Sequence, residues 1–158
     1  MKAKRYCLVV VDSSVVQSAG ETEYPVSRVC REVLDGILRI CHHIIITNAI
    51  REEWKRHHSR YTRKWRFQMN GRKKIEVIKE DKLPSLKINE SYFTESELDA
   101  LKKDLPLLEA ACFGDGIIIT RDERVRDICS KYEKQIKLTK SIRWIIPGDD
   151  VTKCLEEL

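Results

Sequence analysis

The stretch YCLVVVDSS, from Tyr6 to Ser14, is the clearest structural signal in the sequence. Its continuous apolar, β-branched run ends at Asp12, which is typical of a strand buried on both faces of a parallel sheet. Two isoleucine runs, Ile44–Ile46 and Ile117–Ile119, have the same character. Because segments with helical spacing of apolar residues separate these runs, the sequence predicts an α/β fold. The expected architecture has three layers, α/β/α, with a mostly parallel central sheet.

Further elements are expected on both sides of these runs. In the first half they are a helix over Val26–Ile40, a helix from Ala49 as far as Met69 and a short edge strand at Ile75–Ile78. In the second half they are a helix from the capping box Thr94–Glu97 through Lys103, a restart at Asp104–Pro106 that reaches Cys112, a helix from Asp122 to about Tyr132, a strand at Ile142–Ile146 and a short C-terminal helix.

The composition is that of a globular domain. The chain has 158 residues, of which 42% are apolar and 35% charged, and its mean hydropathy is −0.43. This length suits one core, so we expect residues 1–158 to form a single domain. The basic segment 1–5 precedes only five apolar residues, Cys7 to Val11, which are too few for a signal peptide or a membrane span. We therefore expect a cytoplasmic protein with no membrane partner.

The positive charge is concentrated in one segment. The net charge is +5, yet residues 51–74 hold ten basic and two acidic residues, and the rest of the chain is slightly acidic. Such a segment attracts a polyanion, so we expect its cations to bind nucleic acid. They are Arg51, Lys55, Arg56, Arg60, Arg63, Lys64, Arg66, Arg72, Lys73 and Lys74.

Aromatic residues lie among these cations and allow two interpretations. Trp54, Tyr61, Trp65 and Met69 recur at helical spacing, which favours a helix that turns them toward the core. Exposed aromatic rings, Phe67 included, would instead stack on unpaired bases. The charge argument is the same in both cases.

Acidic residues follow several of the expected strands. Asp12 ends the first strand, Asp122 follows Ile117–Ile119 closely, and Glu52 and Glu53 lie in the helix after Ile44–Ile46. Parallel strands would bring these carboxylates to one edge of the sheet, together with Asp104. Like charges repel, so such a cluster calls for a cation, and oxygen ligands favour Mg²⁺ or Mn²⁺. Each aspartate could instead cap a helix, and Glu53 could be an exposed helix residue.

The order of these motifs resembles the PIN domain, a family of Mg²⁺- or Mn²⁺-dependent nucleases. The resemblance rests on VVVDSS with Asp12, ITNAIREEW with Glu53, and KDLPLLEAACFGDGIIITRDE with Asp104 and Asp122. It extends from Leu8 to about Ile146. It implies a PIN-like fold in which these four carboxylates hold one or two metal ions, and Glu53 is preferred to Glu52 because it follows Ile50 by three residues and precedes Trp54.

The resemblance also implies an activity, the endonucleolytic hydrolysis of RNA phosphodiester bonds by metal-activated water. Supporting roles fall to Ser13 and Thr120 at the metal waters or phosphate, to Glu109 beside or instead of Asp104, and to Asp127 as an outer member. A toxin of a toxin–antitoxin pair is one version, with an antitoxin partner and a homodimer. The alternative is a catalytically idle PIN-like module that binds RNA through the basic helix.

Overall fold

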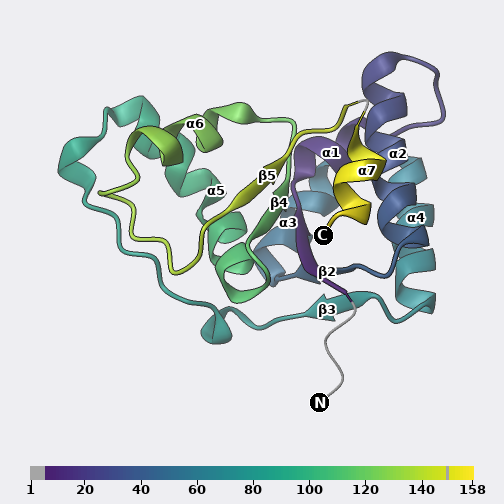
Figure 1. The fold of residues 1–158 in the computed structure, drawn as a ribbon, viewed down its shortest axis with the longest axis horizontal. Coiled ribbons are helices and arrows are strands. Elements are labelled where there is room, and N and C mark those ends of the chain that lie inside the picture. Colours follow the sequence, from purple (N-terminus) through teal and green to yellow (C-terminus); the bar gives the residue numbers. More distant parts are fainter. Residues whose placement is uncertain (1–5, 149) are drawn as a thin grey trace.

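The central element of the fold is a parallel sheet of five strands, β1 (Leu8–Val11), β2 (His43–Ile46), β3 (Ile75–Val77), β4 (Ile117–Ile119) and β5 (Arg143–Ile145). The structure is a computed structural model that describes residues 6–148 and 150–158. The strand order is β3-β2-β1-β4-β5, and every neighbouring pair is parallel (Figure 1). The predicted α/β class is therefore confirmed. The basic segment 1–5 lies outside the described residues.

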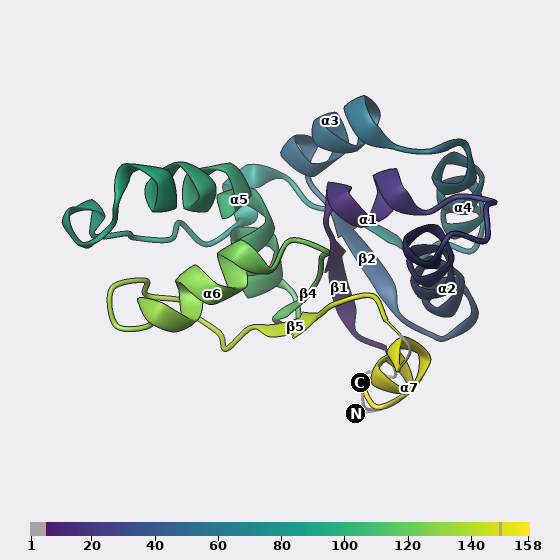
Figure 2. The ribbon, with the colours of Figure 1, turned by 90° about the horizontal axis from the view of Figure 1, so that it is seen from above.

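In the described part of the chain, seven helices connect and flank the strands, with two short 3₁₀ turns at Glu80–Lys82 and Glu90–Tyr92. The helices are α1 (Ser13–Ser18), α2 (Pro25–Arg39), α3 (Asn48–His57), α4 (Arg60–Gly71), α5 (Glu95–Phe113), α6 (Glu123–Lys131) and α7 (Val151–Glu156). Helices α1 to α4 gather on one side of the sheet, and α5 and α6 on the other (Figure 2). The chain moves outward from β1 to β3 and then returns to β4, so the order reverses between β1 and β4. Ligand sites of open parallel sheets lie beyond the strand ends at such a point.

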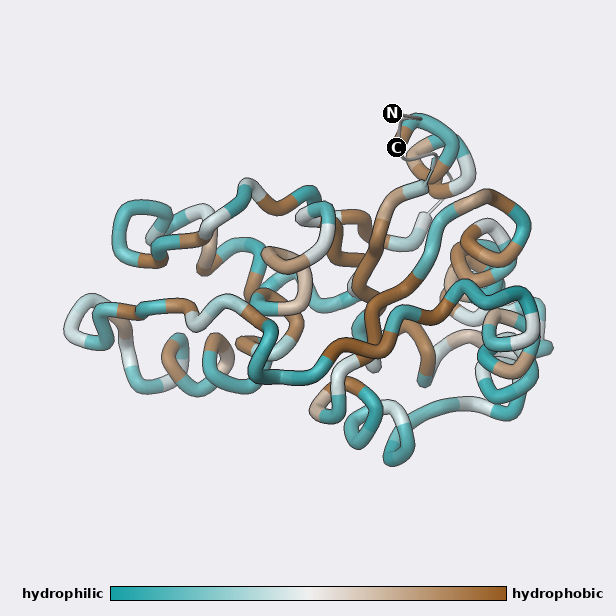
Figure 3. Tube along the Cα trace, turned by 90° about the horizontal axis from the view of Figure 1, so that it is seen from below, coloured by the Kyte–Doolittle hydropathy of each residue, from teal (hydrophilic) through white to brown (hydrophobic). Residues whose placement is uncertain are grey.

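The apolar strands form the core, as expected for a sheet covered on both faces. Val9, Val10 and Val11 have no exposed surface, and the isoleucines of β2 and β4 are buried with them. Figure 3 shows the hydrophobic residues concentrated along the central strands, with hydrophilic segments outside. Trp54, Trp65 and Met69 are also buried, and Tyr61 is partly buried against the core, which confirms the interpretation that turns these four residues inward. Phe67, in contrast, is exposed.

Two local predictions were wrong, and one helix was not predicted. The helix expected from Ala49 to Met69 is divided into α3 and α4, because the Ser59 hydroxyl accepts from the Thr62 amide and starts a new helix. The expected restart at Asp104–Pro106 does not occur, and α5 continues with Pro106 inside it. Helix α1 was not expected at all, since six residues are too few to show a helical period.

The described part of the chain contains no helix that is both long and apolar enough to cross a membrane.

Lys74, which we predicted to bind nucleic acid, is instead part of the core. Only 7% of the residue is exposed, and its ammonium donates hydrogen bonds to the carbonyls of Ile37, Leu38 and Ile40 at the end of α2. These are carbonyls that a helix leaves without partners at its C-terminus. Burial, reinforced by Arg72, lowers the pKa of Lys74 to about 8, so the side chain is still charged at pH 7.

We expect Lys74→Met to destabilise the protein by about 2 kcal/mol, because it leaves buried carbonyls without their charged donor. Urea unfolding at pH 7 measures this loss. Lys73→Met, at the exposed neighbouring position, is the matched control and should change the free energy of unfolding by less than about 0.5 kcal/mol. Equal effects of the two substitutions would contradict this role of Lys74.

Candidate metal and phosphate cleft

A cleft of about 440 Å³ opens beyond the carboxyl ends of the strands, between α1, α3 and α5. All four carboxylates that the sequence singled out, Asp12, Glu53, Asp104 and Asp122, line it. They come from four segments that are far apart in the sequence. The strand order places them together, because β1 and β4 are neighbours and end at the same edge.

Asp12 is fixed at the end of β1. Its amide donates to the Ile119 carbonyl (2.9 Å) and so extends the pairing of β1 with β4 by one residue. Its carboxylate accepts hydrogen bonds from the hydroxyls of Ser14 (2.6 Å) and Thr120 (2.8 Å), both at Oδ2. Asp12 precedes α1 at the N-cap position, yet its side chain makes no capping hydrogen bond. The carboxylate therefore lines the cleft without capping the backbone of α1.

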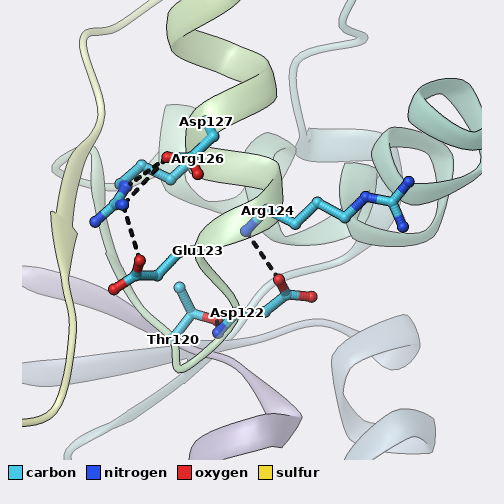
Figure 4. Close-up of polar contacts among 6 residues, drawn as sticks. All are labelled: Thr120, Asp122, Glu123, Arg124, Arg126 and Asp127. Atoms are coloured by element: carbon cyan, nitrogen blue, oxygen red, sulfur yellow. Dashed lines mark hydrogen bonds and ion pairs between the residues drawn. The ribbon is translucent and has the colours of Figure 1, made fainter. Parts of the chain in front are cut away.

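Asp122 combines a structural role with a place in the cleft. It precedes α6, and its Oδ1 accepts from the Arg124 amide at 2.9 Å (Figure 4). Its own amide donates to the Thr120 hydroxyl at 3.0 Å. Thr120 thus connects Asp12 and Asp122 through its hydroxyl. Thr120 itself is buried and does not line the cleft, so its expected contact with a metal water or a phosphate stays a prediction.

The pKa of Asp104 reflects both its burial and the charges of the neighbouring carboxylates. It lies within α5 and therefore does not cap a helix. Burial, followed by the charges of Asp12 and Asp122 and more weakly by Glu53, raises the pKa of Asp104 to about 7, and Lys103 offsets only part of this. Burial and the neighbouring carboxylates therefore both disfavour the charged form of Asp104.

Both glutamates of α3 line the cleft, but they differ in their neighbours. Glu52 pairs with Lys55 at 2.9 Å, whereas Glu53 lies 3.4 Å from the His57 ring and 4.0 Å from Arg56. Glu53, and not Glu52, contributes to the raised pKa of Asp104. The buried Trp54 beside it donates to the Val11 carbonyl (3.1 Å) and ties α3 to the end of β1. These contacts favour Glu53 as the fourth carboxylate.

Among the residues expected to support the site, Ser13 lines the cleft, but Glu109 and Asp127 do not. Asp127 pairs with Arg126 on the exposed side of α6, as does Glu123 (Figure 4). Sequence reasoning missed Ser14, whose hydroxyl is the shortest contact of Asp12. The signal for it was present in VVVDSS, but we did not predict the helix that turns Ser14 back toward Asp12.

The cations of residues 51–74 are distributed more widely than predicted. Of the ten, only Arg56 lines this cleft. Arg72 donates to the Leu38 carbonyl, and Lys74 is buried. The division into α3 and α4 turns most of the others toward another face of the molecule.

The donors of the cleft suit a hydrated Mg²⁺ or Mn²⁺ better than a fully enclosed metal. In residues 6–148 and 150–158, no three His, Cys, Asp or Glu side chains form a ready-made coordination shell. Mg²⁺ commonly needs only one or two carboxylates and keeps several waters. Oxygen donors that are spread around an open cleft meet that requirement, whereas a structural zinc site would require four close ligands.

Comparison with known proteins adds no relative: no family model matches the chain, and a search of curated proteins gives no match.

The raised pKa of Asp104 predicts a specific dependence of stability on pH. In the metal-free protein, Asp104 stays protonated between about pH 4 and 7 when folded and ionises when unfolded. The free energy of unfolding therefore falls as the pH rises through this window. Asp104→Asn should be the more stable protein at pH 8, by on the order of 3 kcal/mol, and should lose this advantage at pH 4.

Urea unfolding in EDTA at several pH values measures the difference between the two proteins. Asp99→Asn, at an exposed position of the same helix, is the control and should follow the wild-type curve. A constant difference between wild type and Asp104→Asn from pH 4 to 8 would show that Asp104 is not subject to this repulsion.

Proposed function

We propose that this protein is a metal-dependent endoribonuclease that hydrolyses RNA phosphodiester bonds in the acidic cleft. The observation that carries the proposal is the convergence of Asp12, Glu53, Asp104 and Asp122 in one cleft at the carboxyl ends of β1 and β4. The sequence motifs that contain them resemble the PIN domain nucleases. RNA, rather than DNA, follows from that resemblance.

Each carboxylate has a distinct place in the proposed chemistry. Asp12 and Asp122, joined through Thr120, would be the fixed ligands of Mg²⁺ or Mn²⁺, and Asp104 and Glu53, which line the same cleft, would complete the set of carboxylates. A bound ion of this kind lowers the pKa of an attacking water and neutralises charge on phosphate oxygens. Lys103 and Arg56 border the same cleft and offer cations to the phosphates on either side of the scissile bond.

Lys103 and Arg56 also make the otherwise acidic cleft suitable for an anionic substrate. Without them, a carboxylate cluster would repel a phosphodiester before a metal is bound. A toxin paired with an antitoxin protein is one form of the proposed nuclease; that form adds a protein partner and a homodimer to the RNA.

A second candidate, an RNA-binding module with an idle cleft, is favoured by the present side-chain partners. Oδ2 of Asp12 accepts from two hydroxyls, and Glu53 has His57 and Arg56 as neighbours. A metal would have to compete with these contacts. Cleavage of a generic RNA in Mn²⁺, compared with EDTA, separates the two functions.

We expect Asp12→Asn and Asp122→Asn each to lower Mn²⁺-dependent RNA cleavage by about 100-fold or more, because each removes a charged metal ligand. Both variants should fold. An Asn oxygen can still accept from Ser14 and Thr120, and Asn caps a helix as well as Asp does. Circular dichroism and the melting temperature check the fold, and gel analysis of a labelled RNA measures the rate.

Asp127→Asn is the matched control, since it removes the same charge from α6 outside the cleft. It should cleave at close to the wild-type rate. Full activity in either Asp12→Asn or Asp122→Asn would refute the site assignment, and a wild-type protein that cleaves no RNA in Mn²⁺ would favour the idle module.

A further inference from the structure

A second pocket, of about 400 Å³, lies on another face of α3. Arg51 precedes Glu53 by two residues and therefore lies about half a turn away around the helix. Arg51 from α3 and Arg63 and Arg66 from α4 line this pocket. We call it the arginine pocket. His58, Phe67, Asn70 and three apolar residues of β2 and β3 complete its wall.

Within the described residues, the three arginines have no anionic partner. Some other arginines of this protein are paired: Arg31 lies 3.1 Å from Glu23, and Arg126 lies 3.1 Å from both Glu123 and Asp127. In the described part of the chain, neither an ion pair nor a hydrogen bond to protein satisfies Arg51, Arg63 or Arg66. Three guanidinium groups that share a pocket without a carboxylate leave a place for an anion.

Unsatisfied buried atoms point to the same place. Within residues 6–148 and 150–158, two buried side-chain nitrogens lack a hydrogen-bond partner, Arg51 Nε and His58 Nδ1. Both belong to residues of the arginine pocket. A buried polar atom without a partner is costly, and its presence in a native fold calls for an explanation such as a missing ligand.

The charges of the pocket also repel one another. Burial, followed by Arg63 and Arg66, lowers the pKa of His58. Burial and then Arg51 lower the pKa of Arg66. The same physical situation exists, with opposite sign, among the carboxylates of the acidic cleft.

An exposed aromatic ring lies at the edge of the pocket. Phe67 is 80% exposed, more than any other large hydrophobic residue described. It borders the arginine pocket and also a neighbouring hollow lined by Arg60, Arg63, Lys64 and Gln68, so that Arg63 lines both. An aromatic face between two groups of cations is the arrangement that single-stranded nucleic acid requires, since its bases stack while its phosphates are neutralised.

We propose that the arginine pocket binds one phosphate of a single-stranded nucleic acid and that Phe67 stacks on an adjacent base. The choice of RNA as the strand rests on the proposed nuclease function, but the binding itself needs neither a metal nor the acidic cleft. Phe67 favours a nucleotide over an acidic peptide, because carboxylates would use the arginines and leave the ring exposed.

Fluorescence anisotropy with a labelled unstructured 12-nucleotide RNA, measured in EDTA with the whole protein, tests this site. We expect Arg63→Gln and Arg66→Gln each to weaken binding about 10-fold and to reduce its salt dependence. Phe67→Leu should weaken binding by about 10-fold with an unchanged salt dependence, because it removes stacking and no charge. Arg63 and Phe67 are exposed, so these variants should keep the wild-type melting temperature.

Two controls define the ligand. Arg28→Gln removes a charge from an exposed ion pair on α2 and should bind within twofold of wild type. A base-paired RNA of the same sequence should bind more weakly and be insensitive to Phe67→Leu, and inorganic phosphate should compete only at concentrations far above that of the strand.

The proposal is overturned if Arg63→Gln, Arg66→Gln and Phe67→Leu bind the RNA no more weakly than Arg28→Gln, or if phosphate alone competes as well as the strand. Because the assay measures binding and not cleavage, failure of the arginine-pocket proposal can be distinguished from failure of the proposed nuclease function. If the wild-type protein binds the RNA but does not cleave it in Mn²⁺, only the proposed function of the acidic cleft is refuted. If the wild-type protein cleaves RNA but these variants bind it as well as wild type does, only the proposed role of the arginine pocket is refuted.

Discussion

The parallel pairing of β1 with β4 is the constraint on which the site depends. It brings the ends of two buried strands side by side, and the Asp12 amide extends the pairing to Ile119. Thr120 then connects Asp12 to Asp122 through its hydroxyl. The other two carboxylates are brought to the same strands by packing: Trp54 ties α3 to the Val11 carbonyl, and α5 packs against β1 and β4. Four distant segments thus meet because of one strand order.

Placing like charges close together costs free energy. This fold does so at two sites, which lie on two sides of α3. On one side of α3, burial and neighbouring carboxylates raise the pKa of Asp104 to about 7. On the other side, three arginines share a pocket without an anionic partner. A cation in the first and a phosphate in the second would relieve both costs. A nuclease that binds a strand and activates water at a metal needs both kinds of site.

The sequence predicted those features that depend on local pattern. The valine and isoleucine runs identified the buried strands, and the aspartates that follow them identified the edge of the cleft. Features that depend on tertiary contacts were missed. From the sequence, Lys74 is expected to be a surface cation. It is buried because its ammonium donates hydrogen bonds to the carbonyls at the end of α2. Ser59 interrupts the predicted helix by capping α4, and both its amide (3.2 Å) and the Thr62 hydroxyl (2.7 Å) donate to the Val16 carbonyl of α1. No pattern within α4 reveals that partner.

Anomalous diffraction from a crystal of this protein soaked in Mn²⁺ would show whether the acidic cleft binds a metal ion. We expect a Mn²⁺ peak in the acidic cleft, bound to Asp12 or Asp122 either directly or through one water. Asp104 and Glu53 should lie on the other side of the ion. A crystal that shows no Mn²⁺ in this cleft at saturating metal, or Mn²⁺ only at exposed carboxylates elsewhere, would contradict the proposed metal site.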